Sequence, residues 1–249
     1  MEQTLRMTVI GSGDAFGSGG RLQTCLHLRA SGDEGTLLID CGATALTGLK
    51  RYGCDPAEVA VVAVSHLHGD HFAGLPFLIL DGQFRRRTRP LHLVGPPGLD
   101  DRLHQAMEVL FPGSTSVTRR FAVHVHETPP GSDLTLGTCH VQAFAVDHQA
   151  GAPALALRVT LAGRTIAYSG DTAWTDTLLT VADGTDLFVC EAYTADRAVP
   201  GHLHLPDLVS HAAQLRCRRL LLTHAGPSVL DQPLAPHLTL AHDGMTIDL

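Results

Sequence analysis

Short apolar runs alternate with loops rich in glycine and proline along the chain, a pattern that predicts strands with a few interspersed helices. Strands are expected at Met7–Ile10, Cys25–Leu28, Thr36–Ile39, Val59–Ser65, Leu91–Val94, Phe121–Val125, Val141–Val146, Ala154–Thr160, Thr165–Tyr168, Leu187–Cys190 and Arg219–Thr223. Helices are expected at Ala43–Tyr52, Leu75–Phe84, Leu99–Leu110, Thr175–Ala182 and Pro206–Leu215. No composition shift marks a linker, so the pattern favours one α/β domain over residues 1–249, built on two sheets.

Composition narrows the class of protein. With 44% hydrophobic and 17% charged residues in 249 positions, the chain has the makeup of a folded domain and not of a disordered one. The net charge of −7 disfavours a protein that coats nucleic acid. No apolar run has the length of a membrane span, and the start MEQTLRMTVIGSG lacks a signal-peptide core. We therefore expect a cytoplasmic protein without a membrane partner.

Histidine is unusually frequent, with 16 copies. Histidine is the commonest metal ligand, but a high count can also reflect compositional bias, so the placement of these residues must decide. The six cysteines include no C-x-x-C pair and point neither to a zinc knuckle nor to a disulfide framework.

The most informative motif is the H-x-H-x-D-H signature formed by His66, His68, Asp70 and His71. It follows the apolar run 59–64 and so begins where a strand ends, a place where rigid scaffolds present functional groups. His66 and His68 can point the same way from an extended segment, and Asp70 and His71 could serve a second ion. Zinc, manganese and iron accept such ligands, so the motif predicts a metal site; a surface histidine cluster is the alternative.

Other apolar runs also end in a metal-type residue. These residues are Asp40 after run 36–39, His148 after run 141–147, Asp171 after run 165–170 and His224 after run 220–223. A single histidine after a strand carries little meaning. Five such strand ends meeting at one edge of a two-sheet structure would assemble a site for two metal ions.

Two further segments have competing interpretations. The stretch 11–17, GSGDAFG, departs by one position from the dinucleotide pattern G-x-G-x-x-G, and no apolar helix follows it. We expect a glycine loop there, with Gly11 and Gly13 allowing close backbone approach. Arg85, Arg86, Arg87 and Arg89 could bind a substrate phosphate, or could form the solvated end of the preceding helix.

The order D, H-x-H-x-D-H, H, D, H, with the segments SHLHGDHFAGLPFL and YSGDT, resembles the metallo-β-lactamase fold hydrolases. Within them the sequence is most similar to the ribonuclease Z-like branch. The resemblance covers nearly the whole chain, from GSGDAFGSGGRLQTCLHL and TLLIDCG to GHLHLPDLVSHAAQLRCRRLLLTH. It implies a four-layer αββα sandwich with metal ions at one edge between the sheets.

The resemblance also implies a role for each residue of the predicted site. It assigns His66, His68 and His148 to one divalent ion, Asp70, His71 and His224 to a second, and Asp171 to a bridge between them. Asp40 would support the ligands without binding metal. Zinc is the expected metal, with manganese and iron as alternatives. Asp70, besides binding metal, and His202 are the expected catalytic residues.

His202 lies 22 positions before His224, where the ribonuclease Z-like branch has a substrate-side histidine that is a candidate general acid. His204 is the competing candidate for this role. Either residue could instead be a solvated loop histidine, because the assignment of a general acid needs geometry.

The spacing between His148 and Asp171 bears on the substrate. Ribonuclease Z enzymes that bind tRNA carry a long arm, which in the bacterial forms lies between the residues matching these two. Only 23 positions separate them here, and the chain is acidic. We therefore expect a small-molecule phosphate ester, either a phosphodiester or a cyclic phosphate, as the substrate, and not tRNA.

Two alternatives stay open at this point. One is a hydrolase of the same fold that acts on a lactone, a thioester or a β-lactam. The other is a metal-binding biosynthetic protein without hydrolytic activity. Homodimers are common in the family that the sequence resembles, so a homodimer is a further expectation.

Overall fold

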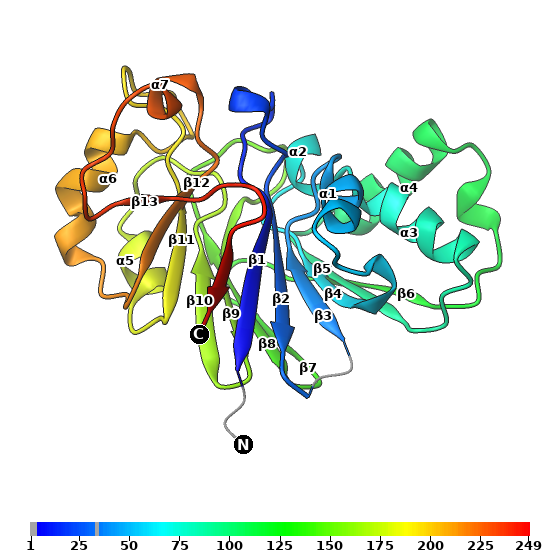
Figure 1. Cartoon of the computed structure of the whole chain (residues 1–249). Coiled ribbons are helices and arrows are strands. Elements are labelled where there is room, and N and C mark those ends of the chain that lie inside the picture. The colour runs from blue at the N-terminus through cyan, green and yellow to red at the C-terminus, as the bar shows by residue number, and fades with distance from the viewer. Residues whose placement is uncertain (1–3, 33–34) are drawn as a thin grey trace.

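Two seven-stranded sheets form the centre of the computed structural model, which describes residues 4–32 and 35–249 (Figure 1). The first sheet has the order β14-β1-β2-β3-β4-β5-β6, and the second has the order β13-β12-β11-β10-β9-β8-β7. In the first sheet the strands are β1 Leu5–Gly11, β2 Cys25–Ala30, β3 Thr36–Ile39, β4 Val59–Ala63, β5 Leu91–Gly95, β6 Val123–Glu127 and β14 Thr246–Asp248. In the second they are β7 Asp133–Leu136, β8 Cys139–Ala145, β9 Leu155–Leu161, β10 Arg164–Tyr168, β11 Leu187–Glu191, β12 Leu220–Thr223 and β13 Thr239–Leu240. Residues 1–3 and 33–34 of the predicted domain, and with them the beginning of the segment MEQTLRMTVIGSG, lie outside the described residues.

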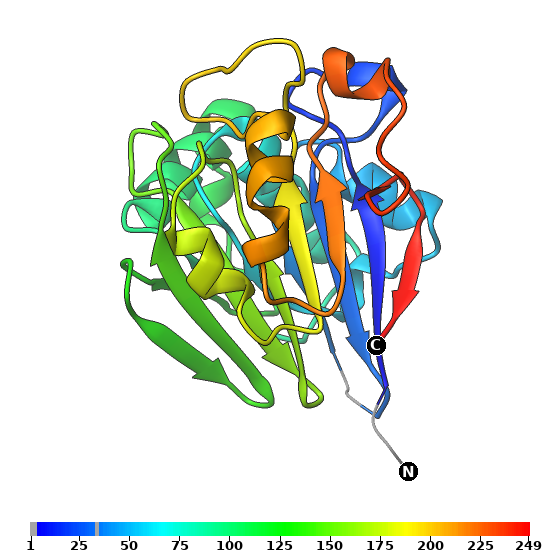
Figure 2. The same ribbon diagram turned by 90° about the vertical axis from the view of Figure 1, so that its left-hand side faces the viewer.

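Helices cover the outer face of each sheet, so that the layers run helix, sheet, sheet, helix across Figure 1, and Figure 2 looks onto the outer helices of the second sheet. The first sheet is covered by α1 Ala45–Arg51, α3 Leu75–Phe84 and α4 Leu99–Leu110, and the second by α5 Thr177–Ala182 and α6 Leu205–His211. Two one-turn helices, α2 Gly69–Phe72 and α7 Pro227–Leu230, lie at the upper edge of the view in Figure 1. The predicted four-layer αββα sandwich is confirmed. None of the helices in the described part of the chain has the length and apolar character needed to cross a membrane.

Strand β4 illustrates why the apolar runs are continuous in this fold. Val61 and Ala63 pack into the core between the two sheets, whereas Val62 packs beneath the helices on the outer face. A strand that is covered on both faces has no polar side to show, so its sequence lacks the alternation of a half-exposed strand.

The strand directions bring the predicted site residues to one edge. The neighbours β3, β4, β5 and β6 are parallel, as are β10, β11 and β12, so their carboxyl ends meet at the same edge of each sheet. Strand β8 ends at this edge too, because β8 and β10 both pair antiparallel with β9. The loops that follow these strand ends form the upper edge in Figure 1.

The strand and helix predictions differ from the structure in several places. The predicted strand Phe121–Val125 is shifted, because Phe121 is buried beneath the helices and the ladder with β5 begins at Val123. The predicted helix Pro206–Leu215 ends at His211 and continues as a 3₁₀ turn at Ala212–Gln214. The strands β7, β13 and β14 were not predicted. The two- and three-residue strands β13 and β14 exist through pairing with the distant β12 and β1, which leaves no local pattern.

Candidate metal centre

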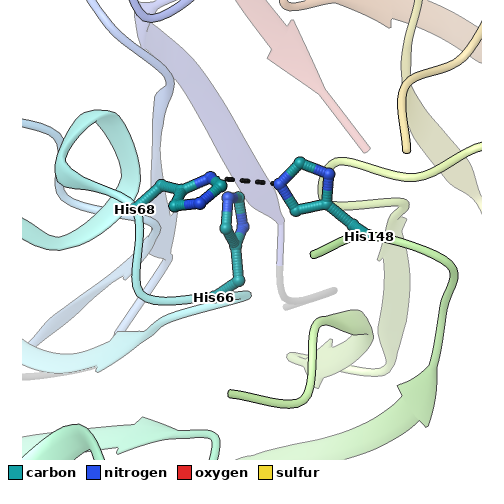
Figure 3. Close-up of side chains that lie close together, drawn as sticks. All are labelled: His66, His68 and His148. Atoms are coloured by element: carbon teal, nitrogen blue, oxygen red, sulfur yellow. Dashed lines mark hydrogen bonds between the residues drawn. The ribbon is translucent and has the colours of Figure 1, made fainter. Parts of the chain in front are cut away.

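Three histidines form the first group of potential metal ligands. His66 and His68 come from the loop after β4, and His148 comes from the loop after β8 (Figure 3). One ring nitrogen from each lies within 4.8 Å of the others, and His148 Nε2 is 3.1 Å from His68 Nδ1. His148 Nδ1 donates to the carbonyl oxygen of Gly201 at 2.7 Å, which leaves the Nε2 lone pair directed at the other two rings.

Four buried side chains form the second group, which consists of Asp70, His71, Asp171 and His224. His71 Nε2 lies 3.1 Å from Asp70 Oδ2 and 3.4 Å from Asp171 Oδ1. His224 Nε2 lies 3.2 Å from Asp70 Oδ2. Asp171 also approaches the first group, since its Oδ2 is 3.8 Å from His66 Nε2. Asp171 therefore connects the second group to the first.

The two groups fit divalent metal ions. His66 Nε2, His71 Nε2 and Asp171 Oδ1 are buried atoms with no hydrogen-bond partner among the described residues. Buried polar atoms are rarely left without a partner, and these three point to a ligand that accepts electron pairs. Imidazole nitrogens and carboxylate oxygens are the donors that zinc, manganese and iron share. The residues could thus hold two ions, with Asp171 contacting both groups.

Asp40 orients residues of the centre from behind. It is fully buried, and its carboxylate accepts from the Ser65 backbone N–H at 2.7 Å, the Ser65 hydroxyl at 2.8 Å and His71 Nδ1 at 2.6 Å. The bond to Nδ1 fixes the His71 tautomer in which Nε2 is free for a metal. Asp40 and His224 both have positive φ, 58° and 55°, conformations that non-glycine residues adopt mainly where the surroundings enforce them.

We expect Asp40→Asn to weaken zinc binding by about 10- to 100-fold, because an amide cannot accept hydrogen bonds at both of its terminal atoms. Asparagine tolerates the positive φ of this position, so the substitution tests the hydrogen bonds and not the backbone. Competition with a chromophoric chelator measures the affinity. Asp243→Asn is the control, since Asp243 also accepts from backbone N–H groups, at Ser12 and Leu22. Equal zinc affinities of Asp40→Asn and the unmodified protein would contradict this role.

The carboxylate of Asp171 and the histidines around it shift one another's pKa values. Burial lowers the pKa of His66 well below its usual range, so this imidazole is neutral. Burial acts in the same direction on His224, but Asp171 and the neighbouring carboxylates outweigh it and raise the pKa to about 10. Burial would raise the pKa of Asp171, yet His224 and His71 hold it well below its usual range. Asp171 is therefore ionised and draws protons onto the imidazoles beside it, and a bound metal ion would take the place of these protons.

His202 lies beside the second group and is held by a residue that the sequence interpretation missed. His202 Nδ1 is 2.6 Å from Glu191 Oε1 and 3.8 Å from Asp171 Oδ2. Glu191, the last residue of β11, is fully buried and also accepts from the backbone N–H groups of Thr172 and Leu203. Glu191 directly follows the apolar run 187–190, so the strand-end pattern that singled out Asp40 could also have found it.

His204, the competing candidate, is placed differently. Its Nδ1 faces Asp207 Oδ2 at 3.4 Å, and the residue precedes the first turn of α6. Of the two histidines, the structure brings His202 to the metal-type donors.

The arginine cluster has a structural role at two of its positions. Arg87 is buried and donates to the carbonyl oxygens of Pro56 and Pro90, and Arg85 pairs with Asp55 at 2.7 Å. For Arg87 both predicted roles, a phosphate-binding residue and part of a solvated helix end, are wrong. Its guanidinium group is hydrogen-bonded to backbone carbonyl oxygens and is therefore not available to bind a substrate.

A cavity of about 480 Å³ opens beside the first donor group and His202. It is lined by His68, Asp147, His148, Gln149, Ala173, Pro200, Gly201 and His202. Its size falls in the range of small-molecule sites, which run from about 300 to 1,000 Å³. The cavity thus places a small ligand against both the first donor group and His202.

The fold and the site together define a metallo-β-lactamase fold protein of the ribonuclease Z-like class. The chain belongs to the family of the anti-Pycsar protein Apyc1, whose pattern matches residues 5–239. An uncharacterised protein of Mycobacterium tuberculosis is 35% identical over 231 residues, which cover 90% of this chain and 82% of that protein. The ribonuclease Z of Methanothermobacter thermautotrophicus is 26% identical over 271 residues, covering 88% of this chain and 86% of the enzyme. The crystal structure of the short form of human tRNase Z matches with a TM-score of 0.80 and 26% identity, over 97% of this chain and 98% of that one.

Proposed function

We propose that this protein is a dinuclear metal-dependent hydrolase that cleaves a small phosphodiester or a cyclic phosphate. The observation that carries the proposal is the pair of donor groups that flank Asp171, with His202 beside them. Similarity to proteins named ribonuclease Z and tRNase Z, which act on phosphodiester bonds of RNA, supports the same bond as the target.

In this proposal His66, His68 and His148 would hold one ion, Asp70, His71 and His224 would hold the second, and Asp171 would be a ligand to both. When bound, two such ions lower the pKa of a shared water towards neutrality and offset the charge that develops on the phosphoryl group. Zinc is the metal we favour, since histidine and aspartate are common zinc ligands; manganese and iron accept the same donors. Asp70 would have its catalytic role as a carboxylate ligand of the second ion.

His202 supplies the proton that the leaving oxygen needs. Burial lowers the pKa of His202, but the hydrogen bond to Glu191 and the charges of Glu191 and Asp171 outweigh this and raise it above its usual value. The proton on Nδ1 is held by Glu191, and the raised pKa favours a second proton on Nε2. His202 lines the cavity, so Nε2–H is the general acid of this proposal.

The size of the substrate follows from the cavity and from the short segment between His148 and Asp171. This segment holds only β9, β10 and their connections, with no arm that could bind tRNA. The acidic net charge would also repel a polyanion at long range. A compact ester whose phosphate reaches the two ions suits these features. Homodimer formation, a single domain over residues 1–249 and a cytoplasmic location stay predictions.

A substrate panel tests the proposal. The metal-free protein is reconstituted with Zn²⁺ or Mn²⁺ and assayed with bis(p-nitrophenyl) phosphate, a 3′,5′-cyclic nucleotide, a lactone and a β-lactam. We expect turnover of the phosphodiesters, abolished by a chelator and restored by added metal. Clear lactone or β-lactam hydrolysis without phosphodiester turnover would contradict the proposal and show that the protein is a hydrolase of the alternative class.

A further inference from the structure

A buried serine connects Asp40 to a histidine of the first donor group. Ser65 lies between the end of β4 and His66 and is fully buried. Its hydroxyl oxygen is 2.8 Å from Asp40 Oδ2 and 3.0 Å from His66 Nδ1. The same oxygen of Asp40 lies 2.6 Å from Nδ1 of His71, a residue of the second group. One carboxylate oxygen is therefore linked to a histidine of each donor group, directly on one side and through Ser65 on the other.

The number of hydrogens available fixes the direction of these hydrogen bonds. A serine hydroxyl has one hydrogen and can donate it once, whereas a carboxylate only accepts. The hydroxyl group of Ser65 therefore donates to Asp40 and accepts from the Nδ1–H group of His66. A neutral imidazole carries one hydrogen, so this arrangement leaves a free lone pair on Nε2 of His66.

The surroundings of His66 agree with this tautomer. Its Nε2 is buried, has no hydrogen-bond partner among the described residues and lies 3.8 Å from Asp171 Oδ2. The nitrogen that is available to a metal ion thus faces the centre, while the other nitrogen is occupied by Ser65. His148 of the same group is fixed in a similar way, by the carbonyl oxygen of Gly201.

The backbone of Ser65 is fixed independently of the hydroxyl group. Its N–H donates to Asp40 Oδ1 at 2.7 Å, and its carbonyl oxygen accepts from the N–H of Leu155, the first residue of β9, at 3.0 Å. These two bonds attach the loop after β4 to Asp40 and to the second sheet. They do not involve the side chain, so Ser65→Ala removes the link to His66 and leaves the backbone bonds in place.

We propose that Ser65 is a positioning residue for the metal centre, whose hydroxyl group transmits the orienting effect of Asp40 to His66. The role rests on the proposed dinuclear centre. Outer partners of this kind fix the orientation of a metal-bound imidazole and make it a stronger ligand. Ser65 does not line the cavity and acts only through His66. Loss of the Asp40 carboxylate would therefore affect both ions, whereas loss of the Ser65 hydroxyl group would affect the first ion.

Zinc binding tests the proposal. Metal-free protein is titrated with Zn²⁺ in competition with a chromophoric chelator, which gives two stepwise affinities. We expect Ser65→Ala to weaken one step by about 10-fold and to leave the other close to its value, whereas Asp40→Asn weakens both. The figure is the lower end of the range for outer partners of metal ligands, because the lost partner is uncharged. Ser114→Ala is the control, since it removes a buried serine hydroxyl that donates to the carbonyl oxygen of Met107. It should keep both affinities.

The imidazole N–H groups give a second readout, which does not depend on activity. Nuclear magnetic resonance of isotope-labelled, zinc-loaded protein should show the Nδ1–H signals of His66 and His71 at low field, because both hydrogens are in hydrogen bonds. In Ser65→Ala the signal of His66 should move to higher field, while that of His71 stays in place. A general loss of structure would change both signals, so the pair of signals separates the two effects.

The outcomes distinguish a failure of this role from a failure of the proposed function. If the unmodified protein binds two zinc ions and Ser65→Ala changes neither the zinc affinities nor the Nδ1–H signal of His66, Ser65 does not position this ligand. If the unmodified protein binds fewer than two zinc ions, the dinuclear centre itself is contradicted, and the role of Ser65 with it.

Discussion

Asp171→Ala is expected to lower phosphodiester hydrolysis by about 10³-fold or more and to reduce the zinc content of the protein. The Asp171 carboxylate contacts a member of each donor group, with 3.4 Å from Oδ1 to His71 Nε2 and 3.8 Å from Oδ2 to His66 Nε2. Alanine leaves the imidazoles without the anion that joins them. Stabilisation of the transition state by two metal ions contributes several kcal/mol, and about 4 kcal/mol corresponds to a 10³-fold change in rate.

The measurement is kcat with bis(p-nitrophenyl) phosphate beside the zinc content of the same sample. Asp186→Ala is the matched control, since Asp186 is a largely buried carboxylate at the opposite end of β10 and β11. It accepts from the backbone N–H of Thr165 and pairs with Arg218. This control should cost stability, seen in thermal unfolding, and retain zinc and kcat. Full zinc content and near-normal kcat in Asp171→Ala would show that Asp171 does not bridge the ions.

The strands that could be predicted from the sequence are those buried on both faces, because every position in them is apolar. Runs such as 59–64 are apolar at every position because β4 is covered by helices on one face and by the second sheet on the other. Strand β7 was missed for the opposite reason. Asp133 and Thr135 face solvent and its remaining two side chains are only partly buried, so the segment resembles a polar loop.

The donor groups were predictable because they follow from topology. A residue just after an apolar run lies at the carboxyl end of a strand, and parallel strands place those ends together. The sequence could not show that Glu191 closes the site behind His202. Glu191 belongs to β11 itself, and its partner lies 11 residues further along the chain, where a loop returns to it. Distances of this kind depend on loop conformation, which local patterns do not encode.

The buried Arg87 is a second feature beyond the reach of the sequence. Four arginines in five positions suggest a binding surface or a solvated segment, yet the guanidinium of Arg87 turns inward to backbone carbonyls around β4 and its preceding turn. The sequence shows how many guanidinium groups a segment has, but it does not show which of them are buried and hydrogen-bonded within the fold.

His202→Ala should slow the hydrolysis of an alkyl phosphodiester by about 10²- to 10⁴-fold and leave bis(p-nitrophenyl) phosphate nearly unaffected. The range is that of general acid catalysis. An alkoxide leaves only if a proton reaches it, whereas p-nitrophenolate is stable without one. A residue that merely supported the fold would lower both rates together, so the ratio of the two rates separates the two roles.

His204→Ala is the matched control for this prediction, since it removes an imidazole two residues away that faces Asp207 and not Glu191. It should leave both rates close to those of the unmodified protein. Glu191→Gln should resemble His202→Ala in a weaker form, because an amide cannot hold the His202 imidazolium as a carboxylate does and the pKa of His202 would fall. The limb of the pH–rate profile that reports His202 would then move to lower pH with the alkyl ester. If the ratio of the two rates were the same in His202→Ala and the unmodified protein, His202 would not be the general acid that protonates the leaving oxygen.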